Sequence, residues 1–234
     1  MNAIYKRELN QYFKTPTGYI FISMFLFITG TYFYLVNLSA QNGDIKNLFS
    51  SIFPIILFLI PILTMRLFSE EKKQKTDELL FTSPISTKEI ILGKFFSTLV
   101  VFLIPLAGTI MYPVILSFFT KPEVLVILGN YIGIILLSSS FISIGLFIAV
   151  IFENQILSAF VTYCMLMLFF IAKSISGVTS NIIIKSVLSS LAITSRYEIF
   201  TYGVFNLINV IYYIGVTMFF IFLSIYFLEK KQIQ

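Results

Sequence analysis

Long stretches without any charged residue alternate with short charged segments along this 234-residue chain. Six of the charge-free stretches have at least 19 residues, enough for a helix to cross roughly 30 Å of hydrocarbon at about 1.5 Å per residue. They are continuously apolar rather than alternating, which favours helices over a barrel. The pattern predicts an all-α polytopic membrane protein whose six spans lie at about residues 17–38, 47–68, 92–119, 124–152, 155–173 and 204–228.

The remaining segments fit a single transmembrane domain over residues 1–234. Residues 174–203 contain only short charge-free stretches, so we expect an extracytoplasmic segment that is either interfacial or re-entrant. The first charge-free stretch has 29 residues, which is too long for the apolar core of a signal peptide.

Residues 1–16 have the pattern of an amphipathic helix. Tyr5, Leu9, Tyr12 and Phe13 recur at helical spacing, whereas cationic and amide side chains fill the other face. Such a helix is expected in the headgroup layer, with its aromatic face toward lipid. Two readings remain open: a generic anchor beside the membrane, or an elbow helix that moves during a transport cycle.

Composition supports the membrane assignment and excludes several kinds of chemistry. The chain is 58% hydrophobic and 12% charged, against roughly 25% charged in soluble domains. It has no histidine and one cysteine, which excludes an internal disulfide and a Cys/His metal site. The charge-free stretches contain no Asp, Glu, Lys, Arg or His, which disfavours ion coupling and acid–base catalysis. No Gly-x-x-x-x-Gly-Lys-Ser/Thr loop exists, so any ATP must be hydrolysed elsewhere.

The basic residues indicate topology rather than nucleic-acid binding, because they form no single-sign patch. If the N-terminus is cytoplasmic, the loops on that side hold eleven Lys and Arg residues and the opposite side holds five. The positive-inside rule then places both termini and residues 66–94 on the cytoplasmic side of a plasma or inner membrane.

Residues 66–94 hold 11 of the 27 charged residues of the chain. Thr76 is a candidate N-cap for a short helix with two acidic residues in its first turn, and Pro84 ends that helix. Ser86 and Glu89 have the spacing of a capping box that opens the third span. The segment is therefore expected to contain a helical extension of the second span, a short separate helix and the start of the third span.

The short helix carries an apolar ridge of Leu79, Leu80 and Phe81 beside carboxylates. Such a ridge suits a helix-in-groove contact with a soluble partner. The alternative is an amphipathic hairpin resting on lipid, but the acidic residues of the segment would face a negative cytoplasmic leaflet. Partner docking is therefore favoured.

These residues resemble the permease subunits of ABC-2 type transporters. The resemblance is carried by Met-Arg-Leu-Phe-Ser-Glu-Glu-Lys from residue 65, Thr-Asp-Glu-Leu-Leu-Phe-Thr-Ser-Pro-Ile-Ser from residue 76, and Leu-Gly-Lys from residue 92. It is closest to the small six-helix subfamily of gliding-motility and nitrous-oxide-reductase maturation permeases. Residues 6–16 and 205–229 agree with that subfamily, although only the charged segment is fairly specific.

The resemblance implies an ATP-driven exporter in which this chain is a non-enzymatic permease. Two ABC ATP-binding subunits would hold ATP and Mg, and a second six-helix permease, identical or related, would complete the complex. The loop between spans two and three would carry a coupling helix, with Glu70 and Glu71 as supporting contacts. That coupling helix would consist of Thr76, Asp77, Glu78, Leu79, Leu80, Phe81, Thr82 and Ser83.

Other readings remain beside this one. The chain could be a membrane scaffold or sensor whose cytoplasmic hairpin docks a soluble protein without transport. A membrane-embedded enzyme is disfavoured because candidate catalytic residues are lacking. The serines at 138–140, Ser143 and Gly145 in the fourth span are expected to allow close helix packing rather than to bind substrate. No residue pattern indicates the substrate.

Overall fold

The computed structural model describes residues 2–41, 43, 45–73, 86–119, 123–178 and 193–233. Within those residues it is all-helical, and six helices are long and apolar enough to cross a membrane. The predicted fold class and the predicted number of spans are thus confirmed. The elements are α1 (Asn2–Lys14), α2 (Pro16–Phe33), the π-helical η1 (Tyr34–Leu38), α3 (Ile45–Thr64), α4 (Arg66–Lys73), α6 (Thr87–Gly108), α7 (Met111–Ser117), α8 (Val124–Ile151), α9 (Gln155–Val178), α11 (Ile193–Thr201) and α12 (Leu207–Ile233).

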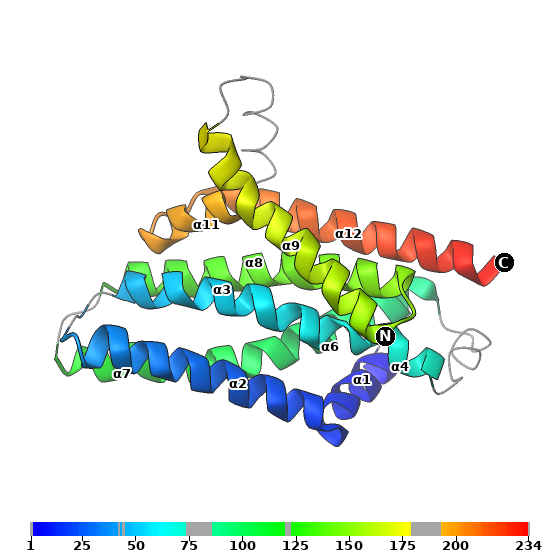
Figure 1. The fold of residues 1–234 in the computed structure, drawn as a ribbon, viewed down its shortest axis with the longest axis horizontal. Helices are drawn as coiled ribbons and strands as arrows, with labels where there is room; N and C mark the ends of the chain where they lie inside the picture. The colour runs from blue at the N-terminus through cyan, green and yellow to red at the C-terminus, as the bar shows by residue number, and fades with distance from the viewer. Residues whose placement is uncertain are drawn as a thin grey trace.

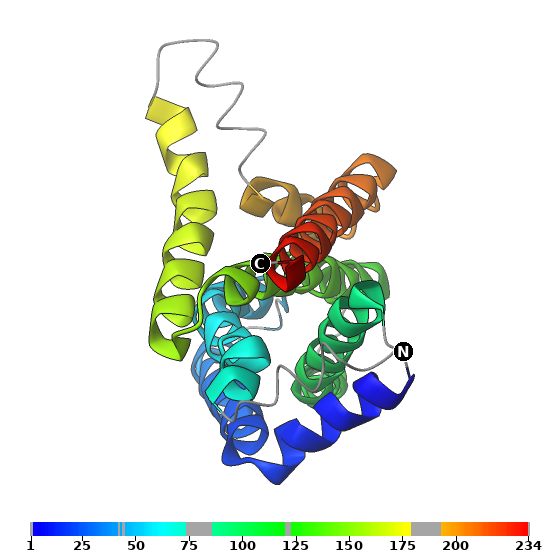
Figure 2. The same cartoon turned by 90° about the vertical axis from the view of Figure 1, so that its right-hand side faces the viewer.

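The corner between α1 and α2 follows from local sequence. Thr15 is extended at the N-cap of α2, and Pro16 occupies the first helical position, where its missing N–H costs no hydrogen bond. Gly18 is required at this corner because a Cβ there would lie 2.5 Å from the Tyr12 carbonyl oxygen. As a result α1 runs crosswise to α2 at one end of the bundle (Figure 2).

The start of α6 matches the predicted cap in part. Ser86 is extended, and its Oγ accepts a hydrogen bond of 3.4 Å from the backbone N–H of Glu89. This contact is the first half of a capping box. The helix therefore begins at Thr87, about one turn before the expected start of the span at residue 92.

Helix α8 is the central helix of the bundle. It packs against α3, α12, α11, α9 and α6, and many of its side chains on all faces are buried. Helices α3, α6 and α12 lie along it, while α9 crosses the bundle obliquely and its last turns lean away (Figures 1 and 2). A helix enclosed in this way needs apolar side chains all round, as the sequence of α8 provides.

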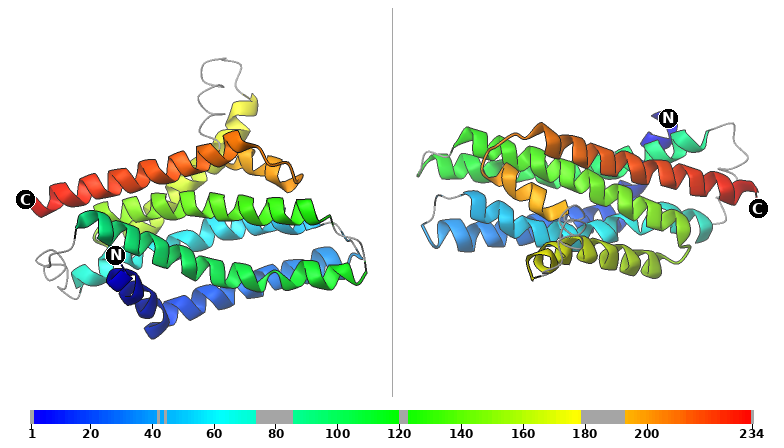
Figure 3. Two further views of the ribbon diagram at one scale, coloured as in Figure 1. Left: turned by 180° about the vertical axis from the view of Figure 1, so that it is seen from behind. Right: turned by 90° about the horizontal axis from the view of Figure 1, so that it is seen from above.

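The two ends of the bundle differ in what they carry. Helix α1, helix α4, the start of α6 and the end of α12 lie at one end, and α11 lies toward the other (Figures 1 and 3). We call the first the α4–α6 end. Within the expected extracytoplasmic segment, α9 continues as helix to Val178, and α11 packs on α8 with Tyr197 and Phe200 buried.

Candidate functional site: a buried ion-pair network at the α4–α6 end

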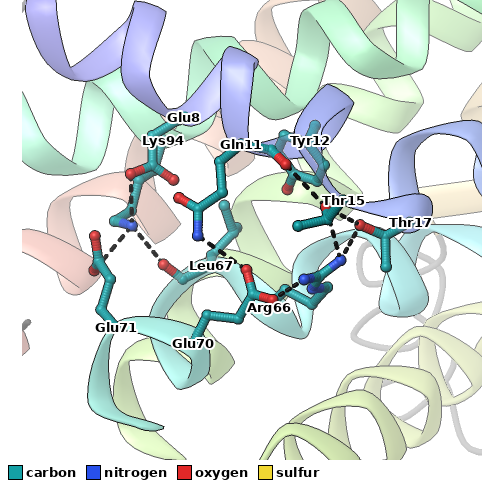
Figure 4. Close-up of a pocket in the computed structure, with 10 residues that line it drawn as sticks. All are labelled: Glu8, Gln11, Tyr12, Thr15, Thr17, Arg66, Leu67, Glu70, Glu71 and Lys94. Atoms are coloured by element: carbon teal, nitrogen blue, oxygen red, sulfur yellow. Dashed lines mark hydrogen bonds and ion pairs between the residues drawn. The ribbon is translucent and has the colours of Figure 1, made fainter. Parts of the chain in front are cut away.

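The predicted coupling helix, residues 76–83, lies outside the described residues. The structure does show its two attachment points, the end of α4 at Lys73 and the start of α6 at Thr87. Directly beside them is a network of ten residues that we call the polar joint (Figure 4). Its members are Glu8, Gln11, Tyr12, Thr15, Thr17, Arg66, Leu67, Glu70, Glu71 and Lys94.

Lys94 is at the centre of the polar joint. Its residue is 0% exposed, and its ammonium lies 3.2 Å from Glu8 Oε1 and 3.0 Å from Glu71 Oε2. The same ammonium donates a 2.5 Å hydrogen bond to the carbonyl oxygen of Leu67. Three acceptors match the three N–H donors of a lysine. The side chain of α6 is thereby held by α1 and α4 together.

Arg7 completes the charge balance around Lys94. Its guanidinium donates to Glu8 at 2.7 Å and also to Glu71. Burial alone would lower the pKa of Arg7, but its hydrogen bonds and attraction to both carboxylates raise that pKa overall. The arginine therefore stays charged, and two cations neutralise the two carboxylates, which are 4% and 6% exposed as whole residues.

A second ion pair ties α4 to the corner between α1 and α2. Arg66 pairs with Glu70 one turn along α4, and it donates to the hydroxyls of Thr15, at 3.1 Å, and Thr17. The amide of Gln11 donates to Glu70 at 3.0 Å. Arg66, Glu70 and Glu71 of α4 thus each contact α1, α2 or α6.

Tyr12 links the polar joint to the membrane-spanning helices. Its hydroxyl donates to the Leu63 carbonyl at 3.0 Å and lies 3.2 Å from Thr98 Oγ1. Burial raises the pKa of Tyr12 above its usual range, so the hydroxyl remains a neutral donor. The predicted aromatic face of α1 is therefore only partly directed outward: Tyr12 is buried in the protein, and the buried stripe of α1 runs through Ile4, Glu8 and Tyr12.

The polar joint is a structural connection rather than a ligand pocket. Its internal cavity has a volume of about 10 Å³, which is room for one water molecule. Its cations and carboxylates are paired. Glu70 and Glu71, which the sequence suggested as partner contacts, bind Gln11, Arg66, Arg7 and Lys94 within the chain, and whether they also touch a partner stays a prediction.

Sequence reasoning missed Glu8, Arg7 and Lys94 as functional residues. A signal existed, because Glu8 is the only carboxylate in the basic arm and lies one turn from both Ile4 and Tyr12. Lys94 lies seven residues after the first residue of a helix that is otherwise uncharged from residue 90 onward. Charges at such positions require partners, but periodicity alone does not say which helix supplies them.

Two further contacts join other elements at the α4–α6 end. Thr87 Oγ1 donates to Glu229 at 2.9 Å, which connects the start of α6 to the end of α12. Lys231 lies 3.1 Å from Glu153, between α12 and the turn from α8 to α9. Both pairs are exposed and contribute little stability individually.

Small residues in the spans serve close packing. A Cβ at Gly145 of α8 would lie 2.4 Å from Thr64 Oγ1 of α3, and Ser140 Oγ donates to the Tyr213 carbonyl of α12 at 3.1 Å. An open groove of about 440 Å³ between α6, α8 and α12 is lined by apolar side chains with Ser139 and Thr217. No cluster that could hold a metal ion occurs among the residues that the structure describes.

Comparison with known families gives one match of nearly full length. The model of a family described as ABC-2 family transporter protein matches residues 3–232. The matched range contains the whole polar joint, the loop between α4 and α6 and all six candidate spans. No curated protein matches the chain.

Proposed function

The chain belongs to the ABC-2 transporter family, and we propose on this basis that it forms the membrane-spanning half of an ATP-driven exporter. Members of this family are components of membrane transporters and are not themselves catalytic. ATP and Mg²⁺ would be bound by two copies of a separate ABC ATP-binding subunit. A second permease, identical or related, would complete the complex.

In this proposal the α4–α6 end faces the cytoplasm and receives the ATPase subunits. The excess of Lys and Arg in the loops on that side supports this orientation. Residues 76–83 would be the coupling helix, and its apolar ridge would enter a groove of the ATPase. Glu70 and Glu71 would support it from inside the chain, by fixing α4 to α1 and α6.

The mechanism rests on one observation: Lys94 of α6 forms ion pairs with both α1 and α4. Breaking a buried ion pair by removing one partner costs about 3–5 kcal/mol, so the joint resists opening when the loop is pushed. We therefore propose that α1, α4 and the first turns of α6 move as one body. Met65, which interrupts the helix between α3 and α4, would be the point where this body bends against the second span.

The coupling helix is tested by substitution at its ridge and at its acidic flank. We expect Leu79→Asp and Glu78→Arg to abolish stimulation of the cognate ATPase and co-purification with it, because they place a charge in an apolar contact or reverse one beside it. Lys230→Glu at the exposed end of α12 is the matched control and should leave both unchanged.

The result that contradicts docking at residues 76–83 is full stimulation by both loop variants in correctly inserted protein. Recovery of the intact chain with a soluble protein other than an ATPase would instead support the scaffold reading. The assay therefore separates a wrong docking site from a wrong class of function.

A further inference from the structure

The opposite end of the bundle contains a cluster of residues around one cation, and the proposed coupling through the polar joint does not involve it. Arg196 of α11 lies against the first turns of α12. Its guanidinium carbon is 4.1 Å from the ring centroid of Tyr212, a distance typical of a cation–π contact. Its Nη1 donates a long hydrogen bond of 3.4 Å to Asn209 Oδ1. We call these three residues the arginine cluster.

Two hydrogen-bond donors of the arginine cluster find no acceptor among the residues that the structure describes. These are the Nε of Arg196 and the Nδ2 of Asn209, both buried, and Asn209 as a residue is 3% exposed. Unpaired buried donors are rare in folded proteins because each loses its hydrogen bond to water. Within the described part of the chain, Arg196 also forms no ion pair with a carboxylate. The cluster thus has a positive charge and two donors that lack an acceptor.

The depth of the arginine cluster matches that of lipid headgroups. Asn209 is two residues beyond the start of α12 at Leu207, so it lies only about 3 Å along the span. Tyr202 and Phe205, just before α12, are 67% and 45% exposed. Exposed aromatic residues of this kind mark the boundary between hydrocarbon and headgroups. Phospholipid phosphates occupy the same layer.

We propose that the arginine cluster binds the phosphate of a phospholipid headgroup in the leaflet at this end. The planar guanidinium group can donate two parallel hydrogen bonds to two oxygens of a phosphate, and the ring of Tyr212 holds the guanidinium in place. Arg196 retains intermediate exposure, so the phosphate reaches it from the surface. The Nε–H of Arg196 and the amide of Asn209, which lack an acceptor among the described residues, are the further donors that the proposal assigns to the phosphate oxygens. This site is independent of the α4–α6 end and of the proposed coupling to an ATPase.

The test measures the melting temperature of the delipidated full-length protein in detergent, because a ligand that binds the folded state raises it with concentration. The probes are short-chain phosphatidylglycerol, the matching diacylglycerol without phosphate, and inorganic phosphate. We expect a saturable rise with phosphatidylglycerol and none with diacylglycerol. A similar rise with inorganic phosphate would show that the site takes the free anion, and would overturn the assignment to a lipid.

Variants connect the effect to the cluster. Arg196→Gln should weaken phosphatidylglycerol binding about tenfold or more, because it removes a charge-assisted contact. Asn209→Asp should abolish the rise without lowering the melting temperature of the lipid-free protein, since its carboxylate provides Arg196 with an internal counter-charge. Lys230→Gln, which removes an exposed cation at the other end, should bind normally. Unchanged binding by both cluster variants, or an equal rise with diacylglycerol, would overturn the proposal.

Discussion

Lys94 shows how one residue can determine the position of three helices. A lysine inside a membrane protein is costly unless its charge is compensated, and here Glu8, Glu71 and the Leu67 carbonyl surround its ammonium. Removing both signs of a buried pair is often neutral, whereas removing one leaves an uncompensated charge. The polar joint is therefore expected to be sensitive to single substitutions and tolerant of balanced ones.

Substitution of Lys94 tests this at the residue scale. We expect Lys94→Met to lower the free energy of unfolding by about 3–5 kcal/mol, because two buried carboxylates then share only Arg7. Adding Glu8→Gln to the Lys94→Met variant should recover part of that loss, since the one remaining cation, Arg7, then faces one remaining carboxylate, Glu71. The measurement is reversible unfolding in mixed micelles.

The exposed Lys88 on the same helix is the matched control, and Lys88→Met should change stability by less than about 0.5 kcal/mol. Equal stability of Lys94→Met and Lys88→Met would show that the buried pairs contribute nothing. Strictly additive effects of Lys94→Met and Glu8→Gln would show that the two residues are not coupled.

At the scale of elements, the spans were predictable and the contacts between them were not. The charge-free stretches indicate where the helices cross, and Ser86 with Glu89 indicates where α6 begins. The helical extension expected after the second span is present as α4, which keeps Glu70 and Glu71 in helix to Lys73. The partners of Glu71 are 64 and 23 residues away in sequence, in α1 and α6, and helical periodicity contains no information about such distances.

The crossing of α3 and α8 provides a prediction at this scale. Gly145→Ala should destabilise the protein by about 1–3 kcal/mol, because the added Cβ overlaps Thr64 and forces two buried helices apart. Gly215→Ala on α12 meets nothing within 4 Å, so the higher helix propensity of alanine should stabilise by about 0.5–1 kcal/mol. Melting temperatures of the two variants in detergent give the comparison.

Opposite signs for these two alanine substitutions are the expected outcome. If Gly145→Ala is as stable as the unmodified protein, the close approach of α3 and α8 is not a tight contact. The packing role assigned to the small residues of α8 would then be wrong.

At the scale of the whole molecule, the sequence predicted an all-α protein with six spans and a resemblance to ABC-2 permeases, and the structure and the family match confirm both. What the sequence could not predict is that the arm before the first span is fastened to the second and third spans. That attachment arises from tertiary ion pairs. It joins the end of α4 and the start of α6 to α1.

In the proposed mechanism, ATP-driven motion moves α1 and the start of α6 together. Spin labels can be placed at Lys6, Lys88 and Lys230, which are exposed on α1, α6 and α12, after the single cysteine is replaced by Cys164→Ser. Pairs of labels then report two distances in the assembled complex, with and without a non-hydrolysable ATP analogue. Lys6 to Lys88 lies within the proposed body, and Lys88 to Lys230 joins it to α12.

The decisive measurement is the distance between the spin labels of each pair, determined by pulsed electron–electron double resonance. We expect ATP binding to shift the distance between Lys88 and Lys230, while the distance between Lys6 and Lys88 keeps its position and width. A shift confined to Lys6 and Lys88, or shifts in both pairs, would contradict movement as one body. No shift in either pair would contradict the entry of ATP-driven motion at this end of the molecule.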